Sequence, residues 1–141
     1  MFKHILCPID FSACSRTALT TASTLAASSN ATLMVAHVWE LSPYATTGLM
    51  SGGDAIEALL GDAERLLAEW AASVKRDHGA PQTTLVRGVP WAEIVQLLEA
   101  NRAYDLVVMG THGRTGLKHV LVGSVAERVV RHAPCAVLVV R

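Results

Sequence analysis

The chain has 141 residues with a formal net charge of +0, and 51% of them are hydrophobic against 17% charged. This length and composition predict one globular domain over residues 1–141 with a substantial core, and they argue against a disordered chain. The balanced charge gives no support to a nucleic-acid or membrane partner, and the apolar run that Asp10 ends is too short for a signal peptide or a membrane span.

Hydrophobic periodicity predicts strands that alternate with helices along the chain. Apolar runs of strand length are bounded by turn residues, and the segments between them repeat apolar residues at helical spacing. In chain order the expected elements are a strand at 3–9, a helix at 12–28, a strand at 32–39, a helix at 54–78, a strand at 83–87, a helix that begins at Pro90, a strand at 105–109, a helix at 124–132 and a strand at 135–140.

Local signals mark several of these boundaries. Ser12 is a predicted N-cap and Asn30 a predicted helix stop. Residues 40–53 lack periodicity and are rich in glycine, so we expect a mobile loop there. The helix that follows carries one continuous apolar face, in which Trp70 is expected to belong to the core. The short, polar strand at 83–87 is expected at an edge of the sheet.

The alternation of strands and helices predicts an α/β fold. Right-handed crossovers with two helices on each face give one doubly wound, five-stranded parallel sheet in the order 3-2-1-4-5. The strand order reverses between the first and fourth strands, and ligands of such sheets bind at this switch point, beyond the C-terminal ends of the strands. Two distant segments end there, and we expect them to line one crevice: Pro8, Ile9 and Asp10 from the first strand, and Met109 and Gly110 from the fourth.

A glycine-rich segment joins the fourth strand to the last helix. It contains Gly110, Gly113 and Gly123, and Ser124 follows at the start of the predicted helix. Glycine lets backbone N–H groups approach a phosphate closely, and a helix N-terminus offers free N–H groups and a positive dipole end. Residues 110–132 also contain four Lys or Arg against one acid, so the local charge favours an anion. The sequence therefore predicts an anion site where this helix begins.

These residues resemble the nucleotide-binding branch of the universal stress proteins. That family carries the pattern Gly-x2-Gly-x9-Gly-(Ser/Thr) after its fourth strand, and here Gly110, Gly113, Gly123 and Ser124 match it at that spacing. The first strand ending in Pro-Ile-Asp and the closing Ala-Pro-Cys-Ala-Val-Leu-Val-Val are also similar to the family, so the resemblance covers essentially the whole chain. It implies the adenine nucleotide alpha hydrolase-like fold, with ATP as the ligand at the switch point.

The resemblance also implies roles for the matched positions. Asp10 would accept hydrogen bonds from the ribose hydroxyls, and Val38 would meet the adenine through its backbone. Gly110 and Gly113 would flank the ribose and phosphates, and the start of the last helix would donate to the phosphates. The implied nucleotide-binding residues are Pro8, Ile9, Asp10, Val38, Met109, Gly110, Gly113, Arg114, Gly123, Ser124 and Val125.

Partners and location follow partly from the resemblance. A divalent ion, Mg²⁺ or Mn²⁺, would bridge the ATP phosphates, and the family usually dimerises through its last strand. Residues 135–141 form an apolar strand whose open edge would otherwise promote aggregation, so a homodimer through it is expected. Three cysteines without metal-site spacing predict reduced thiols, no protein metal site and a cytoplasmic protein. The downstream protein partner is not identified by the sequence.

Each of these interpretations has a plainer alternative. Ser124 and Glu127 also form a capping-box pattern, so Ser124 serves either as a cap or as a phosphate ligand. Asp10 is equally suited to a turn. Arg114 either screens phosphates or lies in solvent, and His112 is more readily a loop residue than a phosphate contact.

Three functions therefore stay open. The resemblance favours a nucleotide-dependent stress-response module that acts as a dimer, with ATP, ADP, AMP or a cyclic nucleotide all fitting the pattern. The second function is slow ATP hydrolysis, although no residue stands out as a base for an attacking water and no catalytic residue is assigned. The third is a structural dimer that binds no nucleotide, with Ser124 as a helix cap.

Overall fold

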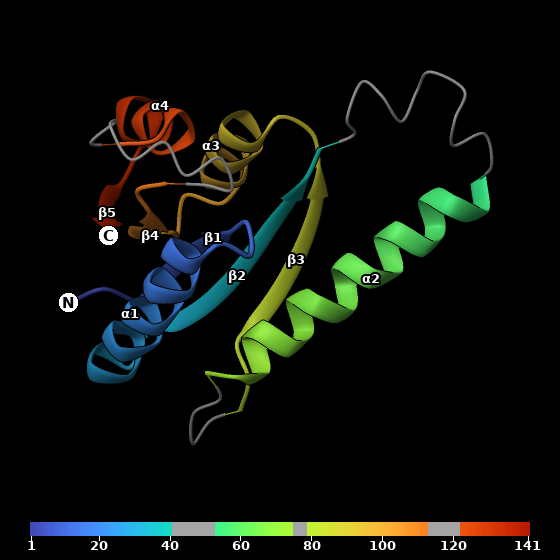
Figure 1. Ribbon diagram of the computed structural model, residues 1–141. Coiled ribbons are helices and arrows are strands. Elements are labelled where there is room, and N and C mark those ends of the chain that lie inside the picture. The colour runs from blue at the N-terminus through green and yellow to red at the C-terminus, as the bar shows by residue number, and fades with distance from the viewer. Residues whose placement is uncertain (41–52, 75–78, 113–121) are drawn as a thin grey trace.

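The computed structural model of the protein describes residues 1–40, 53–74, 79–112 and 122–141 (Figure 1). Strands and helices alternate throughout these ranges, as the periodicity predicts. In chain order the elements are β1 (His4–Ile9), α1 (Ala13–Ser29), β2 (Thr32–Trp39), α2 (Gly53–Ala72), β3 (Gln82–Arg87), α3 (Pro90–Ala100), β4 (Leu106–Gly110), α4 (Ser124–His132) and β5 (Ala136–Val140).

The strands form one parallel sheet in the order β3-β2-β1-β4-β5, which confirms the predicted topology. β1 is central, and its register pairs Ile9 with His37 of β2 and Ile5 with Leu106 of β4. The polar β3 lies at one edge, as its sequence predicts, and β5 lies at the other. Because all the strands are parallel, the C-terminal ends of β1, β2 and β4 lie side by side at the same end of the sheet.

Two helices cover each face of the sheet. α1 and α2 pack on one face over a cluster that includes Leu19 and Leu67, and α3 and α4 pack on the other over a cluster that includes Leu98 and Val129. Successive residues of a strand point to opposite faces, so the central strands contribute to both clusters. This explains why their sequences are apolar without interruption.

The predicted ends of α1 are confirmed. Ser12 accepts a hydrogen bond from the Ser15 N–H at 3.2 Å, and Asn30 ends the helix in the left-handed conformation with φ of 51°. Both residue types suit these positions, because Ser caps helix N-termini and Asn tolerates a positive φ.

α2 differs from its prediction at both ends. It ends at Ala72, short of the predicted end at 78, and the Ser73 hydroxyl donates to the backbone oxygen of Trp70 at 2.6 Å. Such a bond competes with the backbone hydrogen bonds of the helix. Val74 lies beyond the end of the helix but still packs on the core, so the apolar pattern continues past the last helical residue. Residues 75–78 lie outside the described ranges.

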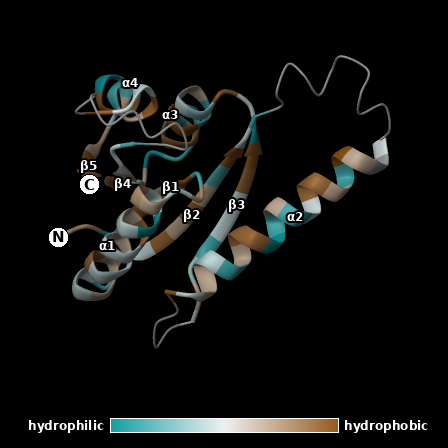
Figure 2. Cartoon of the chain, in the orientation of Figure 1, coloured by the Kyte–Doolittle hydropathy of each residue, from teal (hydrophilic) through white to brown (hydrophobic). Residues whose placement is uncertain are grey.

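The apolar face of α2, which the periodicity predicts to be continuous, is not buried along its whole length. Figures 1 and 2 show its N-terminal half extending beyond the sheet with hydrophobic positions on it, and Leu59 there is 41% exposed. Leu67 and Ala71 are buried in the second half, whereas Trp70 is only half-buried. Most of the expected loop at 40–53 lies outside the described ranges, and Gly53 already belongs to α2.

The three cysteines are free. Cys7 is fully buried in the core, and this burial raises its pKa to about 12. Cys135 packs half-buried against the second cluster, where burial and the nearby Asp105 carboxylate raise its pKa. Burial therefore favours the neutral form of both thiols. No helix in the described ranges is long and apolar enough to cross a bilayer.

Candidate functional site

The two segments predicted to converge do meet at the switch point. β1 and β4 are neighbours in the sheet, so the end of β1 at Ile9 lies beside the end of β4 at Gly110. Pro8, Ile9 and Met109 are buried, and Ile9 and Met109 belong to opposite core clusters. These three can therefore meet a ligand only through the backbone, whereas Asp10 lies half-buried just beyond the strand.

Asp10 begins a tight turn into α1. Its Oδ1 accepts hydrogen bonds from the Ser12 N–H at 3.1 Å and from the Ser15 hydroxyl at 2.5 Å. Phe11, between them, has a φ of 63°, a left-handed conformation that an L-residue other than glycine seldom adopts. Asp10 is thus a turn residue, as the plainer interpretation had it, and it directly follows the end of β1 at the switch point.

His37 supports this turn from β2, and the sequence analysis did not assign it. It is 6% exposed, its Nδ1 lies 2.8 Å from the backbone oxygen of Ile9, and its ring centroid lies 4.5 Å from that of Phe11. A carbonyl oxygen only accepts, so Nδ1 carries the proton in this contact. The available signal was a histidine inside the apolar run of β2.

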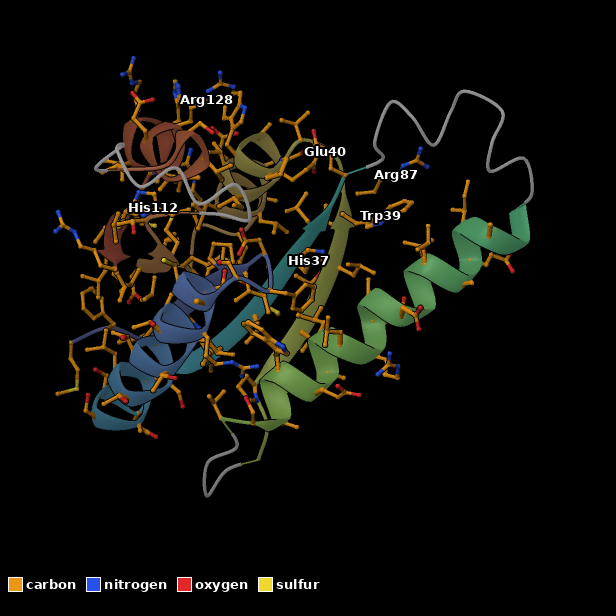
Figure 3. The ribbon with its side chains drawn as sticks, in the orientation of Figure 1. His37, Trp39, Glu40, Arg87, His112 and Arg128 are labelled. Atoms are coloured by element: carbon orange, nitrogen blue, oxygen red, sulfur yellow. The ribbon has the colours of Figure 1, made fainter. Side chains whose placement is uncertain are left out.

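Val38 comes level with Asp10, because the register pairs the preceding residues, His37 and Ile9. The Val38 side chain packs against the cluster under α3 and α4, and its backbone pairs with Val86 of β3 one residue before the end of β2. Figure 3 shows Trp39, Glu40 and Arg87 gathered at the ends of β2 and β3.

Gly110 is needed for the protein's own packing. A Cβ on Gly110 would lie 2.8 Å from the Cβ of Cys14 and 2.9 Å from its carbonyl carbon, so α1 approaches β4 too closely for a side chain. The missing Cβ of Gly110 points toward α1, so the predicted contact of this glycine with ribose and phosphate concerns its backbone.

Gly123 is likewise constrained by the chain itself. Its N–H donates to the backbone oxygen of Thr111 at 2.5 Å, and a Cβ would lie 2.6 Å from that same oxygen. Thr111 is 4% exposed, and its N–H in turn donates to the backbone oxygen of Val140 at 2.9 Å. The Gly123 N–H therefore already has an acceptor within the protein. The N–H groups that follow it, in the first turn of α4, are the ones we consider as donors to an anion.

The start of α4 has no side-chain cap. Gly123 is the N-cap, no side chain caps the helix, and Ser124 is the first helical residue and is exposed. The predicted capping box is thus wrong, because the helix begins one residue too early along the chain for Ser124 to cap it. Glu127 instead pairs with Arg131. The N–H groups of Ser124 and Val125 have no partner within the helix, as in any first turn.

The described basic residues lie away from this N-terminus. Arg131 lies in the last turn of α4, about 10 Å along the helix axis. Arg128 lies over the ring of Trp91, 5.3 Å from its centroid, and Figure 3 shows it on α4. Of the four basic residues counted in the sequence, Arg128 and Arg131 therefore add little positive charge at this N-terminus, and Lys118 lies outside the described ranges. Gly113 and Arg114, both predicted to bind nucleotide, lie outside the described ranges.

The profile of the universal stress protein family matches residues 1–141, and this chain belongs to that family. It is 34% identical to Universal stress protein MJ0531 of Methanocaldococcus jannaschii, over 100% of this chain and 83% of that protein.

Solved structures have the same fold. Protein MJ0577, also of Methanocaldococcus jannaschii, superposes with a TM-score of 0.84 at 28% identity, over 99% of this chain and 96% of that one. A universal stress protein in complex with cAMP superposes with a TM-score of 0.63 at 25% identity, over 99% of this chain and 97% of that one.

Proposed function

We propose that this protein is a cytoplasmic regulatory module of the stress response that binds an adenine nucleotide, ATP foremost, at the switch point of its sheet. The proposal is supported by the position of the Asp10 turn at the end of β1, between its neighbours β2 and β4, together with the uncapped start of α4, where Gly123 bonds to Thr111 just after β4. The complex of a related universal stress protein with cAMP supports an adenine nucleotide as the class of ligand.

Each part of the nucleotide has a matching partner in this proposal. The ribose hydroxyls donate to the Asp10 carboxylate, and the adenine lies against the backbone of Val38. The phosphates accept from the N–H groups of Ser124 and Val125 and from the Ser124 hydroxyl, where the helix dipole also favours negative charge. A divalent ion would arrive with the phosphates, because Mg²⁺ is usually bound through substrate phosphates together with one or two carboxylates.

The geometry weighs on the two alternative functions as well. The structural-dimer hypothesis relied on Ser124 as a cap, and the helix begins without one. For the slow hydrolase, no contact among the described residues adds support.

The phosphate contact can be tested at Ser124 with one unusual substitution. Ser124 is the first residue of α4, where proline is well tolerated, and Gly123 before it has φ of −67° and ψ of 159°, which a following proline accepts. Ser124→Pro therefore removes the N–H and the hydroxyl and keeps the helix. Ser124→Ala removes only the hydroxyl.

Titration calorimetry with ATP and with adenosine separates the outcomes. We expect Ser124→Pro to weaken ATP binding about 10- to 100-fold and Ser124→Ala to weaken it less, since hydrogen bonds to charged groups contribute about 1.5–3 kcal/mol. Adenosine should bind all three proteins equally. Unchanged ATP affinity in the proline variant would sink the phosphate assignment. Gly123→Val is a poor test, because its side chain would strike the oxygen of Thr111 whether or not nucleotide binds.

We also propose that two copies associate through the C-terminal strand at 135–141. β5 pairs with β4 along one side and forms the edge of the sheet on the other. Leu138 on β5 is 38% exposed and Val130 on the adjoining α4 is 52% exposed. Apolar side chains beside an open strand edge suit pairing with a second copy.

A further inference from the structure

The Ser15 hydroxyl donates a hydrogen bond to the carboxylate of Asp10, the candidate ribose-binding residue. Ser15 lies in the first turn of α1 and is 4% exposed. Its oxygen lies 2.5 Å from Asp10 Oδ1, 3.0 Å from the backbone nitrogen of Asp10 and 3.3 Å from the hydroxyl oxygen of Ser12. One buried hydroxyl therefore contacts both the backbone and the side chain of Asp10.

The direction of each bond follows from the chemistry of the groups. An ionised carboxylate only accepts and a backbone N–H only donates, so the Ser15 hydroxyl donates to Oδ1 and accepts from the Asp10 N–H. The Ser12 hydroxyl can fill the second acceptor position of Ser15. All the hydrogen-bonding capacity of Ser15 is then used, and its burial keeps water from competing.

The surroundings make this arrangement rigid. Ser15 is anchored in α1 by its own N–H, which donates to the Ser12 hydroxyl. Phe11, in its left-handed conformation, is held by His37 at 4.5 Å and by Trp70 at 5.2 Å between ring centroids. A backbone conformation of this cost persists where its neighbours determine it, and such places often serve binding. The carboxylate is thus oriented before any ligand arrives.

We infer that Ser15 is a positioning residue that fixes Asp10 for the ribose and sets the preference for ATP over its deoxy analogues. The inference rests on the proposed function, because it concerns the same crevice. A site built to pair with a hydroxyl discriminates against a ligand that lacks it, provided that the pairing group stays in place. Ser15 supplies that condition, whereas a merely structural residue would affect all nucleotides equally.

The test compares affinities for ATP, 2′-deoxyATP and 3′-deoxyATP, measured by calorimetry with Mg²⁺. In the unaltered protein, ATP should bind about tenfold more tightly than the weaker deoxy analogue, as expected for one hydrogen bond to a charged group. In Ser15→Ala this ratio should fall below about threefold, because the carboxylate is no longer held. Ser15→Thr keeps a hydroxyl and should restore the ratio.

Two further variants serve as controls. Ser23→Ala removes another hydroxyl from α1, one that donates to the backbone oxygen of Val74 at 3.3 Å, and should leave the ratio unchanged. In an Asp10→Ala background, Ser15→Ala should have no further effect on the ratio, since the two residues act as one unit. Thermal unfolding of each variant shows that it is folded.

The results distinguish this inference from the function on which it rests. If Ser15→Ala keeps the unaltered ratio while Asp10→Ala loses it, Ser15 only stabilises the turn and the inference is wrong. If Asp10→Ala also keeps the ratio, the ribose role of Asp10 fails. If the unaltered protein binds no ATP, the proposed function fails and the inference fails with it.

Discussion

A side chain on Gly110 would collide with α1, whatever the crevice beyond it binds. The Cβ of an alanine there would lie within 3 Å of two Cys14 atoms, one of them in the backbone. Gly110→Ala should therefore destabilise the protein by about 1–3 kcal/mol, the usual cost of overpacking. Gly61→Ala is the matched control, because nothing lies within 4 Å of its Cβ position on the exposed side of α2. It should stabilise by about 0.5–1 kcal/mol through helix propensity.

Urea unfolding without nucleotide measures both changes. Opposite signs for the two alanine variants are the expected result. Equal stability of Gly110→Ala and the unaltered protein would show that α1 yields at Cys14, and the packing explanation for this glycine would be wrong.

Single residues also mark where sequence reasoning reached its limit. The spacing of Gly110, Gly123 and Ser124 predicted that the loop matters, and the structure places all three near the switch point. The sequence pattern could not show that the Thr111 oxygen already accepts a hydrogen bond from the Gly123 N–H, since that contact depends on the folded backbone. His37 was missed because histidine within a strand has no periodic signal.

β5 is the element through which we propose that two copies associate. Leu138→Lys would put a charge into the proposed dimer interface and should convert dimer to monomer. Leu59→Lys is the matched control, because Leu59 is also an exposed leucine, 41% against 38%, but lies on α2. Sedimentation equilibrium of the two variants gives their masses directly.

The two lysine variants are informative in either direction. A monomeric Leu138→Lys and a dimeric Leu59→Lys would support pairing through β5. The reverse result would move the interface to the projecting half of α2, and a monomeric unaltered protein would rule out the dimer.

Elements were predicted well where one face is buried throughout and poorly where it is not. β2 was placed at its observed bounds, since an apolar run between turn residues is distinctive. The predicted C-terminal end of α2 lies too far along the chain, because Val74 continues the apolar pattern beyond the last helical residue. The predicted apolar face also runs along the N-terminal half of α2, which extends beyond the sheet, because periodicity records only which positions are apolar and not what covers them.

At the scale of the whole molecule, the order of the strands determines where ligand chemistry can gather. The crossovers on the two sides of β1 run to opposite faces of the sheet, so the strand order reverses between β1 and β4, and ligands of such sheets bind beyond the C-terminal ends of these two strands. Topology could be predicted from the alternation of elements alone. The orientation of the site residues could not, because Asp10 is fixed by Ser15 and the start of α4 by Thr111, through contacts that periodicity does not encode.

The central claim is that an adenine nucleotide binds at this switch point. Amide chemical shifts, followed by NMR during titration of the unaltered protein with ATP and Mg²⁺, test both binding and place. We predict saturable shifts at Asp10, Val38, Ser124 and Val125, with Gln82 at the opposite end of β3 unaffected. An absence of shifts at these four amides up to millimolar ATP would contradict the claim.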